Sequence, residues 1–309
     1  MVMGFVELKE RNGHKLYYYA KSMRVGKKVK KKRIFLGTDL SEELIKRNSK
    51  NALIELRELD FDNILNQKEL SEFELIKTTL NLLISQMEKK SFYEHFVTEF
   101  TYSSNAIEGS TLTLKETSKL LFEGQSPKKP MKNILEAQNH KTAYDYLTGI
   151  KGEKIGQDLV CQIQELVVKG TFSEEVQEYE GKLRSVNVRV GVHIAPQFVE
   201  VPKRLTALIR WFNSNRGKVH PIVFASYFHS EFENIHPFVD GNGRTGRLFL
   251  NFMLTKAGYP PIVIFFKHRP KYYEALEKAC EKKDLKPLIK ILKKCYEEMI
   301  KIYGGETKY

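Results

Sequence analysis

The sequence is poor in cysteine and in long apolar runs, and each shortage argues against a class of protein. Its three cysteines, Cys161, Cys280 and Cys295, form no CxxC pair. Such a count does not fit a disulfide framework or a thiolate zinc site, and it favours a reducing compartment. The longest apolar run covers eight residues, 259–266, and includes two prolines, whereas a bilayer-spanning helix needs about 18 apolar residues.

The first ten residues, MVMGFVELKE, also lack the apolar stretch of a secretory signal. We therefore expect a cytoplasmic protein with no membrane segment. The 309 residues are 41% hydrophobic and 29% charged, a composition that is sufficient for a sizeable core. A chain of this length forms one large domain or two smaller ones.

Positive charge is concentrated at the N-terminus. Residues 1–38 contain eleven Lys and Arg and two Glu, whereas residues 39–309 contain 40 basic and 36 acidic residues. A basic segment of this kind can contact the phosphates of nucleic acid. It can equally be a solvated, lysine-rich hairpin that aids solubility. The rest of the chain is nearly balanced, so its ligand need not be a polyanion.

The periodicity of apolar residues divides the chain in two. Residues 4–9, 16–20 and 29–36 alternate as β-strands do, with a hairpin expected across residues 25–28. From Ser41 onward the spacing is helical, apart from a predicted hairpin within residues 183–201. The expected helices cover residues 41–58, 69–90, 91–103, 113–124, 131–147, 156–170, 202–215, 221–234, 243–257, 270–282 and 284–302.

We therefore predict a mainly α fold with a small, basic N-terminal β module. The predicted domains are the β module (1–40), a helical connector (41–94) and a main helical domain (95–309).

Residues 236–247 carry the clearest chemistry. They read His-Pro-Phe-Val-Asp-Gly-Asn-Gly-Arg-Thr-Gly-Arg, with an apolar helix expected on either side. The second helix begins inside this segment, so its free N–H groups and positive dipole end form an anion site. Arg244 and Arg247 add bidentate phosphate donors. Asp240 can hold Mg²⁺ on phosphate oxygens, and His236 is a candidate base near neutral pH.

Other interpretations of this segment are weaker. Gly241, Gly243 and Gly246 satisfy G-x-G-x-x-G, but a dinucleotide fingerprint follows a strand, and here a helix precedes the glycines. The Gly-Lys-Ser/Thr of a Walker loop is absent. The histidines at 220, 229 and 236 do not have zinc-ligand spacing.

The segment HPFVDGNGRTGR resembles the signature of Fic (Fido) proteins, H-x-F-x-[D/E]-G-N-G-R-x-x-R, at every specified position. The resemblance extends over about residues 95–305 and does not include the β module. It implies a Fic-type helical domain that moves AMP from ATP to a Tyr, Thr or Ser hydroxyl of a target protein. In such an enzyme His236 is the base and Asp240 holds Mg²⁺. The implied nucleotide-binding residues are Gly241, Asn242, Gly243, Arg244, Thr245, Gly246 and Arg247.

The resemblance also suggests finer roles. Backbone N–H groups of Gly241 to Gly243 and the amide of Asn242 would stabilise phosphate oxygens. Arg244 would hold the β-phosphate and Arg247 the γ-phosphate. The hairpin resembles the family's flap, and residues Val190, Gly191, Val192 and His193 would lie along the target backbone by strand addition. Tyr272 and Tyr273 either flank the adenine or pack in the core.

A second motif precedes the signature. Residues 104–109, Ser-Asn-Ala-Ile-Glu-Gly, match the pattern [S/T]-x-x-x-E-[G/N] of the inhibitory helix found in many Fic proteins, which we place at about residues 95–110. Ser104, Glu108 and Gly109 fill the specified positions. The resemblance implies that Glu108 pairs with Arg247 and occupies the position of the γ-phosphate.

Three functions remain open at this point. The first is a self-inhibited, Mg²⁺-dependent protein adenylyltransferase. The second is a related enzyme that removes AMP from a modified hydroxyl, with Glu108 orienting a water. The third is a nucleic-acid-binding regulator that uses residues 1–38. The expected partners are ATP and a target protein, with nucleic acid and a second copy of the chain as further candidates.

Overall fold

The computed structural model describes residues 5–25, 28–55, 61–152, 154–174, 176–190 and 193–305. The chain divides into two compact units, and the larger unit begins at Phe61. Helices predominate, beside a small three-stranded antiparallel sheet, so the predicted fold class is confirmed. Within the described ranges no helix combines the length and the apolar composition that a membrane crossing requires.

The N-terminal unit contains the three predicted strands. They are β1 (Phe5–Arg11), β2 (His14–Val25) and β3 (Lys28–Thr38), in the order β1-β2-β3. The first hairpin turns at Asn12 and Gly13, whose φ angles of 52° and 77° are typical of tight Asn-Gly turns. The expected turn at Gly26 and Lys27 lies outside the described residues.

Helix α1 (Glu42–Glu55) packs on one face of this sheet, over β2 and β3. Tyr19 and Leu36 are buried there, and Leu40 and Ile45 pack against them. Side chains alternate across a strand, so the neighbouring positions of β2 and β3 point to the opposite face. The domain limits at residues 40 and 94 stay predictions.

The larger unit is built from helices that the apolar spacing anticipated, and each predicted range from 91–103 onward overlaps one helix. The range 69–90 was too long, because α2 stops at Ser85 and α3 starts at Lys89. The α-helices are α2 (Gln67–Ser85), α3 (Lys89–Ile107), α4 (Leu114–Phe122), α5 (Met131–Gly149), α6 (Gln157–Val168), α7 (Val201–Asn215), α8 (Pro221–Ile235), α9 (Asn242–Lys256), α10 (Arg269–Lys282) and α11 (Lys286–Tyr303). Short 3₁₀ turns occupy Phe61–Asn63, Gln177–Tyr179, Phe198–Glu200 and Phe266–His268.

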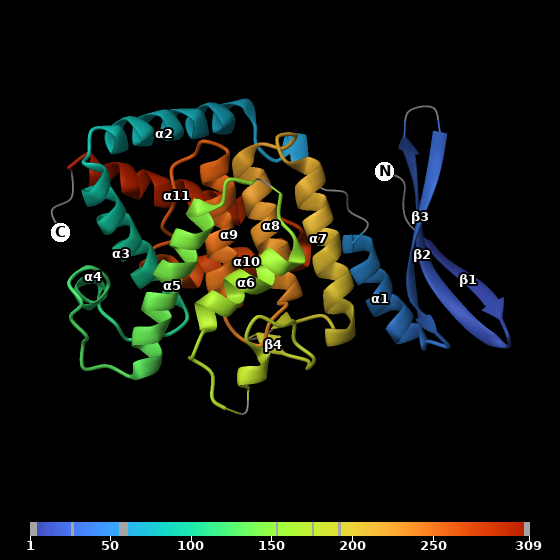
Figure 1. Ribbon diagram of the computed structural model, residues 1–309. Helices are drawn as coiled ribbons and strands as arrows, with labels where there is room; N and C mark the ends of the chain where they lie inside the picture. The colour runs from blue at the N-terminus through green and yellow to red at the C-terminus, as the bar shows by residue number, and fades with distance from the viewer. Residues whose placement is uncertain are drawn as a thin grey trace. The chain divides into compact units, whose positions relative to one another are not determined.

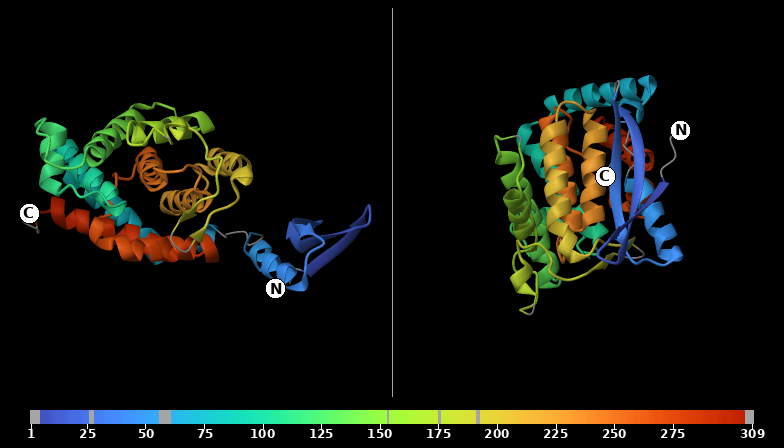
Figure 2. Two further views of the ribbon diagram at one scale, coloured as in Figure 1. Left: turned by 90° about the horizontal axis from the view of Figure 1, so that it is seen from below. Right: turned by 90° about the vertical axis from the view of Figure 1, so that its right-hand side faces the viewer.

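Helices α8 and α9 form the centre of this unit (Figure 1). Helix α9 contacts α3, α5, α6 and α8, while α7 and α11 pack against α8. Figure 2 shows the central pair inside a ring of the other helices. Twelve of the fifteen residues of α9 are buried, including both of its arginines. The loop between α8 and α9 is therefore fixed by elements from much of the chain.

The structure contains the short hairpin that the apolar alternation predicted within residues 183–201. Strands β4 (Arg189–Val190) and β5 (His193–Ile194) pair antiparallel over two residues each. Gly191 and Val192, which the sequence assigned to the flap, lie outside the described residues.

Candidate active site

The loop between α8 and α9 is shaped by two left-handed residues. His236 ends α8 with φ 49°, and Gly241 precedes α9 with φ 81°. Glycine is needed at 241 for a second reason, since an added side-chain carbon would lie 2.7 Å from Cγ1 of Val168 on α6. The two bends place His236 at the same end of the helix pair as the N-terminus of α9.

The side chain of Asn242 holds this loop closed. Its Oδ1 accepts from the N–H of Phe238, and its Nδ2 donates to the carbonyl of Phe238, both at 2.9 Å. Both ends of the amide are thus engaged within the loop. This geometry does not fit the expectation that the Asn242 amide faces phosphate, and it leaves that role to backbone N–H groups.

Arg247 lies buried beside the C-terminal end of α3. Its Nε donates to Oγ of Ser104 at 3.0 Å, and one terminal nitrogen donates to the carbonyl of Ser104 and to Oε1 of Glu108, each at 2.8 Å. Burial works to lower the pKa of Arg247, but Glu108, Tyr272 and Glu233 together outweigh it, and the pKa lies above the usual value. The structure therefore brings together the two residues that the motifs paired.

Glu108 occupies the place where an anion would meet the helix. A side-chain carbon added at Gly243, in the first turn of α9, would collide with Oε1 of Glu108 and lie 2.9 Å from a terminal nitrogen of Arg247. The carboxylate thus lies against the N-terminal turn of α9, where free N–H groups and the helix dipole favour negative charge. Gly109, the last position of the motif, follows with φ 101°.

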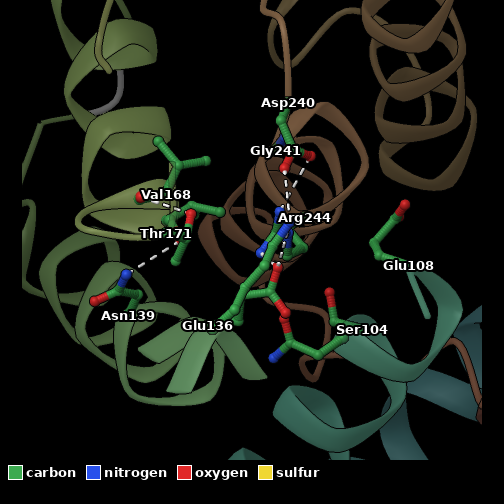
Figure 3. Close-up of polar contacts among 12 residues, drawn as sticks. Ser104, Glu108, Glu136, Asn139, Val168, Thr171, Asp240, Gly241 and Arg244 are labelled. Atoms are coloured by element: carbon green, nitrogen blue, oxygen red, sulfur yellow. Dashed lines mark hydrogen bonds and ion pairs between the residues drawn. The ribbon is translucent and has the colours of Figure 1, made fainter. Parts of the chain in front are cut away.

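Arg244 is held by a different set of carboxylates. One terminal nitrogen lies 3.0 Å from Oε1 of Glu136 on α5, and the other donates to Oδ1 of Asp240 at 3.2 Å. The same Oδ1 accepts from the N–H of Gly241 at 2.6 Å. Figure 3 shows Arg244 between Asp240 and Glu136. Burial raises the pKa of Glu136, and Arg244 offsets that rise only in part.

A third buried arginine connects the loop to the segment before the flap. Arg184 donates through Nε to the carbonyl of His236 at 2.8 Å, and its own N–H donates to the carbonyl of Pro237 at 2.9 Å. Its terminal nitrogens donate to the carbonyls of Val186 and Pro196. Arg184 therefore holds the backbone of His236, the candidate base, and also the chain segments on either side of the hairpin.

A pocket of about 630 Å³ opens at this place. Glu108, Gly243 and Arg247 line it on one side, next to His236. The remaining lining residues are Glu233 on α8 and eight residues of α10. The eight are Arg269, Pro270, Tyr272, Tyr273, Glu274, Leu276, Glu277 and Cys280. Its volume is in the range of small-molecule sites. Arg244 and Asp240 are not among the lining residues.

Both predicted tyrosines line the pocket, but they differ in burial. Tyr272 is fully buried, and its hydroxyl lies 2.6 Å from Nε2 of His229. Tyr273 is 40% exposed, and its hydroxyl donates to the carbonyl of Ile107 at 3.1 Å. One ring is therefore packed in the core and the other is partly exposed at the pocket, and a contact with adenine stays a prediction. Thr245 is buried in α9, and the side chains of Val190 and His193 lie outside what the structure describes.

A buried acid in the same region was not predicted. Oε1 of Glu233 lies 3.9 Å from Nδ1 of His229, and a side-chain carbon added at Gly246 would lie 2.5 Å from that oxygen. Burial raises the pKa of Glu233 to about 8 and lowers that of His229 to about 3. Gly246 is thus required for the close packing of α8 on α9.

Sequence reasoning also missed Glu136 and Gln164. Gln164 on α6 donates to the carbonyl of Asp240 at 3.0 Å and accepts from the N–H of Gly181 at 2.8 Å. Both side chains occur within helices, away from any motif. A signal was present for Glu136, because this acid and His140 stand one turn apart on a helix face that otherwise holds Ile134 and Ala137.

Comparisons with known proteins identify a related family and related folds. A model of the Fic/DOC family matches residues 154–254, which include the loop, α8 and nearly all of α9. Two curated relatives are named protein adenylyltransferase Fic. The protein of Nematostella vectensis is 32% identical over 270 residues, which cover 84% of this chain and 60% of the relative. That of Drosophila melanogaster is 28% identical over 274 residues, covering 84% and 53%. The chain thus spans little more than half the length of these relatives.

Solved structures with similar folds include a Fic domain containing signaling protein from Bacteroides thetaiotaomicron. The TM-score is 0.68 at 25% identity, over 77% of this chain and all of that chain. A fragment of Fic-1 from C. elegans has a TM-score of 0.67 at 24% identity, over 85% and 76% of the two chains, a likeness of fold.

Proposed function

This chain carries a domain of the Fic/DOC family, and we propose that it transfers AMP from ATP to a hydroxyl group of a target protein. The observation that supports this activity most directly is the shared pocket. His236, the first turn of α9 and Arg247 all face one cavity of about 630 Å³. A base, an anion-binding helix end and a phosphate-binding guanidinium are the groups that such a transfer requires.

In the proposed reaction the hydroxyl oxygen of the target attacks the α-phosphorus of ATP. The bond from this phosphorus to the bridging oxygen breaks, and pyrophosphate leaves. His236 accepts the hydroxyl proton as the new P–O bond forms. Its position is set by the left-handed end of α8 and by Arg184, which holds its carbonyl at 2.8 Å. Such positioning accounts for much of the rate in phosphoryl and nucleotidyl transfer.

The phosphates are assigned to α9. Backbone N–H groups of residues 241–243 bind oxygens at the helix end, and Arg247 binds the γ-phosphate. Arg244 is assigned to the β-phosphate, which would contact the side of the guanidinium that faces Asp240. The adenine would lie along α10, where Tyr273 is exposed to the pocket and Tyr272 supports the wall.

Mg²⁺ is proposed as the metal cofactor, with Asp240 as its ligand. The Asp240 side chain is 41% exposed, and Oδ2 lies 3.9 Å from Nζ of Lys132. In the part of the chain that the structure describes, no three His, Cys, Asp or Glu side chains form a metal cluster. A single carboxylate fits Mg²⁺, because this ion is commonly held by one or two carboxylates plus phosphates and water. When bound, it would neutralise charge on the phosphates.

Self-inhibition follows from the place of Glu108. The carboxylate engages the guanidinium that the γ-phosphate requires, at 2.8 Å. ATP bound beside it would lack that contact, and its α-phosphorus would not align with the incoming hydroxyl. We therefore propose that the form described here is the inhibited one.

The reverse reaction is a second candidate. The Glu108 side chain is one-third exposed and lines the pocket, so it can orient a water toward an AMP-modified hydroxyl. An assay with ATP against one with an AMP-modified protein separates the two directions. The proposed setting is the cytoplasm, and the target would pair with the β4–β5 hairpin by strand addition. A homodimer stays a prediction from the resemblance.

The test is incubation with labelled ATP and Mg²⁺, with and without cell extract, followed by mass spectrometry. We expect AMP on the chain itself or on an extract protein. His236→Ala should lower labelling about 10²–10⁴-fold while ATP binding persists. His14→Ala, on the N-terminal sheet, is the matched control. Near-normal labelling by His236→Ala would remove this residue from the mechanism, and absence of any AMP product from both the parent and Glu108→Gly would overturn the proposed activity.

A further inference from the structure

The sheet of the N-terminal unit has one face that no described element of that unit covers. Helix α1 packs on the face that contains Tyr19 and Leu36. Positions that alternate with these two residues form the open face, which we define as Phe5, Glu7, Lys9, Tyr18, Lys31, Arg33 and Phe35. Cross-strand pairs confirm this grouping, because Tyr18 lies opposite both Glu7 and Phe35 in the register.

Aromatic rings lie on all three strands of the open face. Phe5 on β1 is 47% exposed, and Phe35 on β3 is 51% exposed. Tyr18 on β2 lies between the strands that carry them, with its ring centroid 5.3 Å from that of Phe35. Large apolar rings at half exposure leave π-faces available to a partner.

Cations are interleaved with these rings. The ammonium of Lys9 lies 5.5 Å from the ring centre of Tyr18, and that of Lys31 lies 4.6 Å from the ring centre of Phe5. Glu7 pairs with Lys31 and accepts from Nε of Arg33 at 2.6 Å. The carboxylate orients the two cations of β3 on the face, and three cations against one acid leave the face positive.

Charge complementarity indicates the partner. Residues 1–38 carry eleven Lys and Arg against two Glu, so the surface attracts a polyanion. An aromatic ring stacks most favourably on a partner that also has a flat face. Bases of a duplex are stacked and paired, whereas bases of a single strand expose their faces.

We propose that the open face of the β1–β3 sheet binds single-stranded nucleic acid. Bases stack on Phe5, Tyr18 and Phe35, while phosphates contact Lys9, Lys31 and Arg33. Such a face tolerates many sequences, because every base has a π-face and no hydrogen-bonding pocket is needed. The proposal does not depend on AMP transfer, and it describes a second binding site in the N-terminal unit.

Binding is measured on the full chain by fluorescence anisotropy with labelled dT20, with the duplex of the same length and with vesicles of anionic lipid. Affinity for dT20 should exceed that for the duplex and fall steeply with salt. Phe35→Ala should weaken dT20 binding about tenfold or more, the effect of losing one stacked base. Lys31→Gln combined with Arg33→Gln should reduce the salt slope by roughly one to two.

Two control variants change similar groups on the helical unit. Tyr146→Ala removes a ring that is 41% exposed, and Lys290→Gln with Lys301→Gln removes two exposed charges. Both should bind dT20 as the parent does. The proposal is overturned if dT20 does not bind at low salt, if the duplex or the vesicles bind as tightly, or if Phe35→Ala binds as the parent does. Circular dichroism establishes that each variant is folded.

Discussion

Two arginine–carboxylate pairs lie in the first two turns of α9, and they differ in what surrounds the acid. Arg244 and Arg247 are equally buried, with side chains 1% and 2% exposed. The partner of Arg244 is Glu136, whose side chain is 9% exposed within the middle of α5. The partner of Arg247 is Glu108, which is 33% exposed where α3 ends.

The difference separates a structural counterion from a displaceable one. Glu136 is held by a helix that contacts α3, α4, α6 and α9, so moving it would disturb the core. Glu108 lines the pocket and is followed by Gly109 at φ 101°, in a turn outside the helix. In the proposed function, a phosphate that enters the pocket replaces Glu108 at Arg247. It has no comparable access to Glu136.

The largest effect should come from breaking the structural pair. Glu136→Ala leaves the buried guanidinium of Arg244 with Asp240 as its described partner, and the loss of a buried counterion commonly costs about 3–5 kcal/mol. Urea unfolding should therefore show a large fall in the free energy of unfolding. Glu136→Gln keeps an acceptor and should cost less.

The matched control is a surface pair. Glu94 lies 3.9 Å from Lys90 on α3 with its side chain 40% exposed, and Glu94→Ala should change stability by less than about 1 kcal/mol. If Glu136→Ala were as stable as the control, both arginine pairs would be dispensable and the comparison would fail.

Breaking the displaceable pair should raise activity. A bias of about 3 kcal/mol toward the Glu108–Arg247 contact would leave under about one per cent of molecules competent. Glu108→Gly should therefore increase self-labelling with ATP by up to about 100-fold. Rates of AMP incorporation at saturating ATP and Mg²⁺ provide the measurement.

Two further variants test whether the gain depends on the contact itself. Arg247→Ala should not activate, because it removes the γ-phosphate ligand together with the partner of Glu108. The double variant should behave as Arg247→Ala does. Equal labelling by the parent and Glu108→Gly would end the case for self-inhibition and leave the proposed transfer untouched.

The same contrast explains how much of the site was predictable. His236, Asp240 and both arginines belong to one contiguous string, and Glu108 belongs to a second, so motifs name them. Glu136, Gln164 and Arg184 reach the loop from α5, α6 and the segment before β4, and only tertiary packing brings them there. The helices were predictable from apolar spacing. The short hairpin was predictable as well, from the alternation of its valines, and two residues of each strand pair in the structure.

Arg184 is a third buried arginine beside the loop. Its hydrogen-bond acceptors are main-chain carbonyls, whereas Arg244 and Arg247 pair with carboxylates. Arg184→Lys loses the planar fork that reaches His236, Val186 and Pro196 at once. We expect the turnover rate to fall about tenfold while KM for ATP stays within a factor of about two, because the phosphate groups are held elsewhere.

Steady-state rates for Arg184→Lys and Arg184→Ala, together with urea unfolding, distinguish positioning from stability. If Arg184 positions the loop, Arg184→Lys should recover more of the stability lost in Arg184→Ala than of the turnover rate. Parallel losses of both quantities would make Arg184 a structural residue alone.

The smallest effect concerns a third carboxyl group near Arg247. Burial raises the pKa of Glu233 to about 8 from 4.5, so the folded chain holds a proton that the unfolded chain has lost. Between these values stability must fall as pH rises, by about 1.4 kcal/mol per pH unit for one such group.

His229, with its pKa lowered to about 3 from 6.5, acts in the opposite direction and only below about pH 6.5. Glu99, whose pKa burial raises to about 7, titrates in the same range. Unfolding at pH 6.5, 7.0 and 7.5 is therefore compared between the parent and Glu233→Gln, because only the difference isolates Glu233, and the variant should show the shallower decline. An identical decline in parent and variant would mean that Glu233 is already ionised, so that Arg247 has two charged carboxylates to exchange for phosphate and Glu108→Gly alone cannot free it.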